Sequence, residues 1–491
     1  MTRRARGLLL ALMLVQVLLL VTVAARPPVP PPALPVVTGD ALLNHAERVA
    51  LRVLASDQDG RVHRAAPFYT MPWLRDSYAW GMVPDDAGTL STYARGELRY
   101  WLRHQQPFGG WLSFQYSGWY DETAIMLAAV LDAYRLTGDR GMVHRALPAL
   151  RRGWAWLHGA YADPRHGSRC LLWVTLRPTG PHWAADWADQ VARPGYTPQL
   201  EGLWYRATQA MAALEGLAGS RSAAHRYERS ADCIARDVNR LLWSVAAPAH
   251  RDARPLPAFG HYRAWPPGRN YFEIDGNALL LASGVAAPRQ RTSVLNVVAA
   301  YGSYLLGGDG AGPARVLYGD YAPADYGPIH NWMRPGQYQS AYWPSVGGLL
   351  AVAAASNDCT TLALTVLRGL ARRNGDAGSA FYEWYRGDGR PGNAGHGQYG
   401  WGARMYLLAL YRAYLGVDDA PSITAPADLV LRAAPGPARG ELVRLGMHIT
   451  IVGHGAGHVR YARLGRRILR SAVIPMHLLN NGAVLNVYRS G

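Results

Sequence analysis

Helical periodicity that recurs from Thr38 to about Val417 is the strongest constraint on the fold of this 491-residue chain. In about eleven segments, apolar residues fall at three- and four-residue spacing and glycines or capping residues stand at the ends. The segments span residues 42–55, 91–104, 122–136, 142–159, 201–217, 223–243, 276–286, 289–304, 345–355, 359–373 and 401–415. We expect a twelfth helix in the irregular stretch before Trp343. An even set of helices predicts a mainly α fold in which helix pairs, at 38–417, close into a double-layered barrel.

The two ends of the chain differ from this helical part. Basic residues, an apolar run and a small Ala24–Ala25 pair make residues 1–25 a signal peptide or, at about 18 apolar residues, an uncleaved N-terminal anchor. Either form predicts a secreted or otherwise extracytoplasmic protein, and the second predicts membrane anchoring. Residues 26–37 are a proline-rich linker. Residues 418–491 carry β-type runs such as MHITIVG and AVLNVY, and predict a small β-rich C-terminal segment.

The amino-acid composition limits which binding partners and cofactors fit this chain. Trp 17 and Tyr 28 against Phe 6 favour contact with sugar faces, although such rings also fill cores. The net charge of +17 comes from arginine alone, since the chain has no lysine. Base composition of the genome is the preferred explanation of this bias, although a basic surface also favours acidic glycans, an anionic envelope or nucleic acid. The arginines are dispersed along the sequence, and no nucleic-acid motif is present. Three cysteines are too few for a disulfide framework, and an odd count leaves at least one unpaired. No metal-ligand or cofactor motif is present, so we expect neither.

Two acidic residues stand in a tryptophan-rich loop before the helix that contains Glu201. A carboxyl group beside indole rings is partly desolvated, which raises its pKa and suits a general acid. Asp186 and Asp189, on either side of Trp187, both fit this role. A second carboxylate, Glu383, stands next to Trp384 in a glycine-rich loop, where it can hold and deprotonate a water molecule. Glu383 also fits a surface acid paired with Arg386.

Other residues fit sugar binding. In WLRDS, Arg75 and Asp76 next to Trp73 offer a donor fork and an acceptor pair for adjacent hydroxyls, although a local salt bridge explains them equally simply. Asp121 and Glu122 begin a helix, where acids favour the helix dipole, and one of them is free to contact substrate. Trp343 is either a stacking wall or core filler.

In order along the chain, five motifs resemble those of the six-hairpin (α/α)6 glycosidases. They are WLRDS, DWADQVARPGYTPQLEGLWYRA, EIDGNALLLASGVA, YQSAYWPSVGGLL and FYEWYRGDGRP. The resemblance is closest to the glucosidase domain of glycogen-debranching enzymes and to the processing α-glucosidases. It implies Asp189 as general acid, Glu383 as general base and Glu201 as the glutamate of the following helix. It further implies that Arg75 and Asp76 hold the −1 sugar, with tryptophans 73, 187, 343 and 384 as walls. A His or Asn usual before the W-P segment is replaced by Gln339, Ser340 and Ala341, which leaves the sugar open.

The sequence thus predicts an extracytoplasmic inverting exo-glycoside hydrolase without cofactor, acting on terminal α-linked glucose or a related sugar. Its partner is an oligosaccharide or polysaccharide rather than nucleic acid. Three alternatives stay open. They are the same fold acting on rhamnose, fructose or an acidic sugar, a polysaccharide lyase, and a non-catalytic glycan-binding or envelope protein.

Overall fold

The computed structural model describes most of the chain after the N-terminal region. The described residues are 35–59, 62–67, 69, 72–82, 89–111, 120–162, 164–175, 186–188, 191–249, 257–263, 270–307, 313–326, 337–376, 380–392, 397–419 and 422–490. The predicted signal peptide or anchor at 1–25 lies outside these ranges and stays a prediction. Within them, we find no helix with the length and apolar character that crossing a membrane requires.

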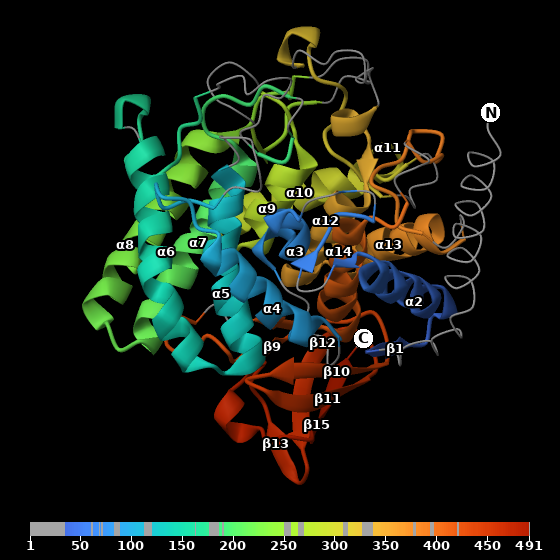
Figure 1. Ribbon diagram of the computed structural model, residues 1–491. Helices are drawn as coiled ribbons and strands as arrows, with labels where there is room; N and C mark the ends of the chain where they lie inside the picture. Colours follow the sequence, from blue (N-terminus) through green and yellow to red (C-terminus); the bar gives the residue numbers. More distant parts are fainter. Residues whose placement is uncertain are drawn as a thin grey trace, which may run out of the picture. The chain divides into compact units, whose positions relative to one another are not determined.

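Within these ranges, six helices contact one another in a closed ring (Figure 1). They are α3 (Leu74–Ser77), α5 (Tyr120–Thr137), α7 (Pro198–Leu217), α9 (Ile274–Ala282), α12 (Pro344–Ser356) and α14 (Gly400–Ala409). Each contacts the next in this order, and α14 contacts α3 to close the ring. All of α14 and nearly all of α5 and α12 is buried, because neighbours surround these helices. Glycine lets two of them approach closely, since a Cβ on Gly348 would lie 2.7 Å from the Cβ of Met405.

A second layer of helices covers the ring. It consists of α2 (Ala41–Ser56), α4 (Thr89–Arg103), α6 (Arg140–Tyr161), α8 (Arg221–Asp237), α10 (Pro288–Ala300) and α13 (Thr360–Ala371), with the short α11 (Gly302–Leu305) after α10. These helices are amphipathic. In α8, for example, Ala223, Ala231 and Ile234 are buried while the arginines of the opposite face are exposed. The expected mainly α fold is therefore confirmed.

All eleven predicted segments contain a helix. The stretch before Trp343, where we expect a twelfth, lies partly outside the described residues, at 308–312 and 327–336, so that helix stays a prediction. The described residues just before Trp343 form only a short 3-10 turn, Tyr338–Ser340, and the two-residue strand β7 (Tyr342–Trp343). The sixth member of the ring is α3, within WLRDS. A single helical turn is too short to show periodicity, so the sequence pattern did not reveal it. Three two-residue ladders lie between the helices: β2 (Gln58–Asp59) with β3 (Val62–His63), β4 (Trp243–Ser244) with β5 (His261–Tyr262), and β6 (Ala314–Arg315) with β7.

Strands follow the last ring helix, as the sequence predicts. The larger sheet has the order β1 (Val36–Thr38), β10 (Ala438–Arg444), β11 (Met447–His454), β15 (Ala483–Ser490), β12 (His458–Leu464) and β13 (Arg467–Leu469), and the smaller has β14 (Val473–Ile474), β9 (Leu429–Leu431) and β8 (Val417–Asp419). Neighbours are antiparallel except β11 and β15. Val36 and Val37, which the sequence analysis placed in the linker, instead pair with β10.

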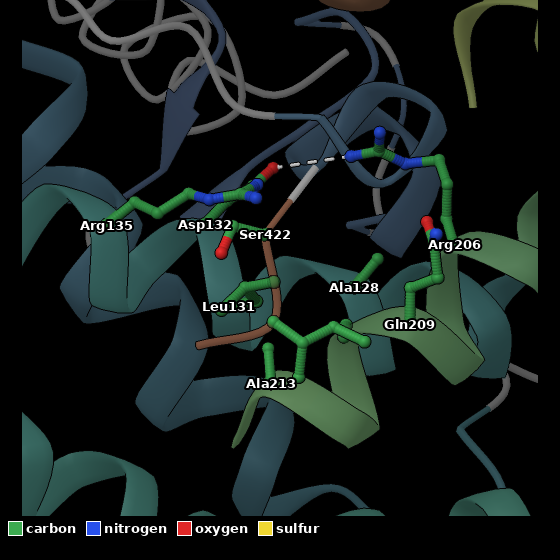
Figure 2. A pocket seen from close by; sticks show the side chains of 10 residues that line it. Ala128, Leu131, Asp132, Arg135, Arg206, Gln209, Ala213 and Ser422 are labelled. Carbon is green, nitrogen blue, oxygen red and sulfur yellow. Dashed lines mark hydrogen bonds and ion pairs between the residues drawn. The ribbon is translucent and has the colours of Figure 1, made fainter. Parts of the chain in front are cut away.

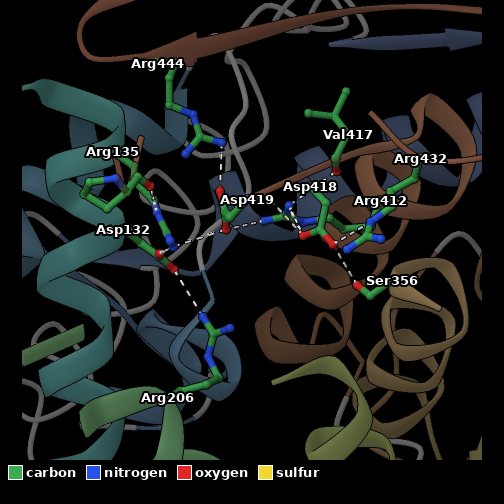
Figure 3. A network of polar contacts seen from close by, with 11 residues as sticks. Asp132, Arg135, Arg206, Ser356, Arg412, Val417, Asp418, Asp419, Arg432 and Arg444 are labelled. Carbon is green, nitrogen blue, oxygen red and sulfur yellow. Dashed lines mark hydrogen bonds and ion pairs between the residues drawn. The ribbon is translucent and has the colours of Figure 1, made fainter. Parts of the chain in front are cut away.

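The strands pack at the C-terminal ends of the ring helices, and ion pairs hold them there (Figure 3). The backbone N–H of Leu445 donates to the carbonyl of Arg135, near the end of α5. Asp419 of β8 lies 3.2 Å from Arg135, 2.7 Å from Arg412 and 2.9 Å from Arg444. Burial by itself raises the pKa of Asp419, but the three arginines together outweigh it and hold the pKa well below its ordinary value.

A disulfide joins two cysteines that the sequence could not pair. Cys170, in the loop after α6, bonds to Cys233 of α8 with a Cα–Cα distance of 6.0 Å, and Cys359 is free. The expectation that one cysteine stays unpaired is met. Among the described residues, the group whose donor atoms lie close enough for a metal is Cys170, Cys233 and Asp237, and there the two sulfurs are bonded to each other.

We expect Asp419→Asn to lower the free energy of unfolding by about 3–5 kcal/mol at pH 7, because it leaves buried arginines without their shared anion. Urea unfolding followed by circular dichroism measures this, with the exposed Asp232→Asn as control. Since the folded-state pKa of Asp419 is depressed, its contribution is complete above the ordinary value of 3.8 and is lost as the pH falls through the folded pKa. The difference between the wild type and Asp419→Asn should therefore shrink in acid. Equal stabilities of the two variants at pH 7 would contradict the role of Asp419.

For the disulfide, which closes a segment of 63 residues, we expect Cys170→Ser with Cys233→Ser to cost about 4 kcal/mol. Cys359→Ser is the matched control, and we expect it to change stability by less than about 1 kcal/mol. Thiol titration of the unreduced, denatured wild type should find one free thiol per chain. Three free thiols in protein kept under air would show that the bond does not form.

Candidate functional site

Closure of the ring brings the N-terminal ends of its helices together. A Cβ on Gly276 of α9 would lie 2.8 Å from the Cβ of Pro198 at the start of α7, and one on Gly402 of α14 would lie 2.9 Å from that of Pro344 at the start of α12. Acidic residues stand in the first turns of four of these helices, where the helix dipole favours them: Asp76, Asp121, Glu122, Glu201 and Asp275. All five are buried. This end of the ring is the candidate active site.

Arg75 of α3 lies close to two acids in the first turn of α5. Its Nη1 is 3.7 Å from Oδ2 of Asp121, its Nε is 3.8 Å from Oε1 of Glu122, and its guanidinium lies 5.1 Å from the centre of the Trp73 ring. Arg75 therefore pairs across to α5, in addition to its electrostatic effect on the neighbouring Asp76. Both Asp121 and Glu122 take part, so neither serves the helix dipole alone.

Two of these carboxyl groups hold protons near neutral pH. Burial raises the pKa of Asp76 to about 8, against the opposing effect of Arg75, and the nearby charges of Glu122 and Glu383 raise it further. Burial likewise raises the pKa of Asp121 to about 7, with Arg75 opposing and Glu122 and Asp186 adding to the rise. Charges that act on these two carboxyl groups must lie near them, so Asp186 and Glu383 are on the same side of the ring as Arg75. The cluster can thus both donate and accept hydrogen bonds at neutral pH.

Glu383 is buried in this cluster and is not a surface acid. It is 3% exposed, whereas Arg386, its alternative partner, is exposed. The hydroxyls of Tyr69 and Tyr338 donate to its Oε1 at 3.3 and 3.5 Å. A carboxylate oriented by two hydroxyls suits a base that activates water.

The other acidic loop is held by a buried arginine that the sequence analysis missed. Asp186 accepts from the backbone N–H of Ala188 at 2.8 Å and from Nη1 of Arg193 at 3.3 Å. Nη1 of Arg193 is also 3.3 Å from Oδ2 of Asp275, which accepts from the indole N–H of Trp187 at 2.8 Å. Asp189, the predicted acid, lies outside the described residues.

Arg193 further contacts Glu273, the residue before α9. Its Nε lies 3.2 Å from Oε1 of Glu273, which also accepts from the hydroxyl of Tyr321 at 2.7 Å. Burial raises the pKa of Glu273 to about 8, with Arg193 opposing the rise. Arg193 and Glu273 stand within motifs that the sequence analysis quoted. Nothing local to either motif shows that these two side chains meet, because 80 residues separate them in the sequence.

The predicted tryptophan walls differ in exposure. Trp73 is half-buried, but Trp343 and Trp187 are 1% and 4% exposed, with ring centres 4.9 Å apart. Two further buried indoles, Trp80 and Trp401, pack on Trp187. Trp343 and Trp187 therefore form a packed floor beneath the acids, while Trp384, at 7%, lies beside Glu383. Trp343 thus packs in the core, and its role as a wall for the sugar stays a prediction.

The structure does not bring Glu201 to Arg75 by any described contact. Glu201 accepts from the backbone N–H of Leu172 at 2.9 Å, and its burial raises its pKa well above the ordinary value. It thus anchors the loop that contains Cys170. A separate cavity of about 60 Å³, between α5, α7 and Ile423, lies at the opposite end of the ring (Figure 2). It has room for a few water molecules only.

Known proteins resemble this chain in structure but not in sequence. No known family model and no curated protein matches the chain by sequence. Among solved structures it is similar to a GH78 family rhamnosidase of Bacillus sp. GL1 (TM-score 0.56, 15% identity, 87% of this chain and 42% of that one). It is also similar to an α-L-rhamnosidase from Dictyoglumus thermophilum (0.57, 11%, 89% and 47%) and to a sialidase (0.60, 12%, 86% and 38%). At such identities the likeness shows a shared fold, and the chain spans less than half of each of these proteins.

We expect Arg193→Met to lower the free energy of unfolding by about 3–5 kcal/mol, because three buried carboxyl groups lose their common cation. The backbone of residues 186–188 should also exchange its amide hydrogens faster. The exposed Arg289→Met removes the same charge and serves as control. If both variants matched the wild type in stability and exchange, Arg193 would not hold this loop.

Proposed function

We propose that the chain is a glycoside hydrolase of the six-hairpin (α/α)6 class that cleaves a terminal glycosidic bond with inversion. One observation supports this most directly. Glu383, held by two tyrosine hydroxyls, is buried beside the Arg75 and Asp76 cluster at the end of a closed helical ring. Inversion needs a carboxylate that activates water and a carboxyl group that protonates the leaving oxygen, about 6.5–9.5 Å away.

In this proposal Asp189 is the acid and Glu383 the base. Asp186, the other candidate acid, uses both carboxyl oxygens within the protein: Oδ1 accepts from the backbone N–H of Ala188 and Oδ2 contacts the guanidinium of Arg193. These contacts suit Asp186 to hold the loop rather than to reach the substrate. Asp189 follows Asp186 by three residues and carries the proton to the substrate.

Arg75 and the protonated Asp76 would hold the hydroxyls of the −1 sugar. A guanidinium donates to sugar oxygens, while a neutral carboxyl group both donates and accepts, so the pair can bind adjacent hydroxyls without repelling them. Trp73 and Trp384 are the two predicted walls that keep some exposure beside this cluster. They offer aromatic surface to a ring face.

For the sugar, α-linked glucose follows from the motif resemblance. A second candidate, α-linked rhamnose, is favoured because two of the similar solved structures are rhamnosidases. An extracytoplasmic location is part of the proposal, and the Cys170–Cys233 disulfide supports it, since such bonds persist in oxidising compartments.

The test is proton NMR of the anomer released from α-glucosides, α-L-rhamnosides and sialosides. We expect the wild type to release the inverted anomer of one of these sugars. Asp189→Asn and Glu383→Gln should each lower the rate by about 10²–10⁴-fold, the usual contribution of a general acid or base. Asp232→Asn, on the exposed face of α8, is the control for loss of a carboxylate.

A retained anomer would contradict the two-carboxylate inverting mechanism. Full activity of Asp189→Asn on polygalacturonate with an unsaturated product would identify a polysaccharide lyase instead. Folded wild type that binds a glycan of the panel and hydrolyses none would identify a binding protein.

A further inference from the structure

The last fifty residues carry an unusual charge pattern. After Glu441 there is no aspartate or glutamate, whereas seven arginines occur between 444 and 489. The interpretation that the arginines are dispersed is therefore wrong for this segment. The rest of the chain contains acidic and basic residues together. A segment with arginines and no acidic residues therefore creates a strong local positive potential.

The structure gathers five of the seven on one hairpin. Arg460, Arg463, Arg466, Arg467 and Arg470 are exposed on β12, β13 and the short connections next to them, while Arg444 and Arg489 are buried. In the described part of the chain, none of the five has an ion pair to a carboxylate. At the end of α8 and in the turn after it, by contrast, Arg236 and Arg240 lie 3.6 and 3.2 Å from Asp237. Neighbouring cations without acids repel one another, so a polyanion would relieve that repulsion.

The hairpin is fixed rather than loosely attached. β12 pairs with β15 as well as with β13, and the ring of Tyr461 stacks on that of Tyr488 with centres 4.7 Å apart. Arg463 stands between Asn486 on one neighbouring strand and Ile468 on the other. Arginines on a paired sheet lose less freedom on binding than arginines of a flexible tail. Their planar forks match carboxylate and sulfate groups.

We propose that the β12–β13 hairpin binds an acidic polysaccharide, separately from the candidate active site. This inference rests on the proposed function for its choice of a glycan over other polyanions. The sheet packs at the C-terminal ends of the ring helices, whereas the acids of the site lie at the N-terminal ends. The hairpin is thus a tether that keeps the enzyme on a polymer rather than a subsite for the sugar that is cleaved.

The experiment measures binding of the full chain to polygalacturonate at low salt. A Glu383→Gln background prevents hydrolysis, so binding is read independently of the reaction. We expect Arg463→Gln, Arg466→Gln and Arg467→Gln together to weaken binding by about 10- to 100-fold, since each cation near an anionic surface contributes about fivefold. The affinity of the triple variant for polygalacturonate should also fall less steeply with salt concentration, because fewer counterions are released on binding. Activity on a short substrate in the wild-type background should not change.

The matched control is Arg221→Gln, Arg226→Gln and Arg229→Gln on the exposed face of α8, which lowers the net charge equally. An equal loss in both triple variants would show that net charge alone binds the polymer and would overturn the proposal. Equal affinity for neutral dextran, for duplex DNA or for phosphatidylglycerol vesicles would do the same. A wild type that hydrolyses none of the NMR substrates would reject the proposed function, and the hairpin result would still be interpretable.

Discussion

Closure of six helices into a ring is the constraint on which the rest of the structure depends. It forces the N-terminal ends of α3, α5, α7, α9, α12 and α14 to one side, together with the residues that precede them. The dipoles of helices that share a direction favour anions at that side, and the sequence supplies acids in four of the first turns. The ring thereby concentrates carboxyl groups before any substrate binds.

Such a concentration of buried charge is costly unless cations and hydrogen bonds compensate it. Arg75 and Arg193 do so at the N-terminal side of the ring. Arg75 lies close to two acids of α5, and Arg193 is shared between the loop that contains Asp186 and the residues that start α9. At the opposite side one anion is shared among several cations, since Asp419 lies close to Arg135, Arg412 and Arg444. At the N-terminal side, burial leaves Asp76, Asp121 and Glu273 with pKa values of about 7 to 8 despite the nearby arginines. At the opposite side, the three arginines keep Asp419 ionised. Buried acids that share cations and a buried acid that is shared by cations thus lie at opposite ends of the ring.

Local sequence patterns predicted most of the helices and several of the residues at the candidate site. Periodicity located eleven helices, because an amphipathic or buried helix of three turns or more leaves a repeat in the sequence. Glu383 and the Arg75–Asp76 pair were singled out from their aromatic neighbours. The prediction failed where the signal was short or not local. The one-turn helix α3 has no period, and the role of Arg193 depends on Asp275, 82 residues further on.

The sequence by itself determined the order of the helices, the change to strands after Val417 and the residue types available for chemistry. These follow from interactions within a few residues. Only the tertiary structure decided which groups meet. Tyr69 reaches Glu383 across 314 residues and Arg135 reaches Asp419 across 284, while Cys170 bonds to Cys233 rather than to Cys359. Such pairs depend on how the ring closes and on how much water is excluded when it does. A local pattern contains neither quantity.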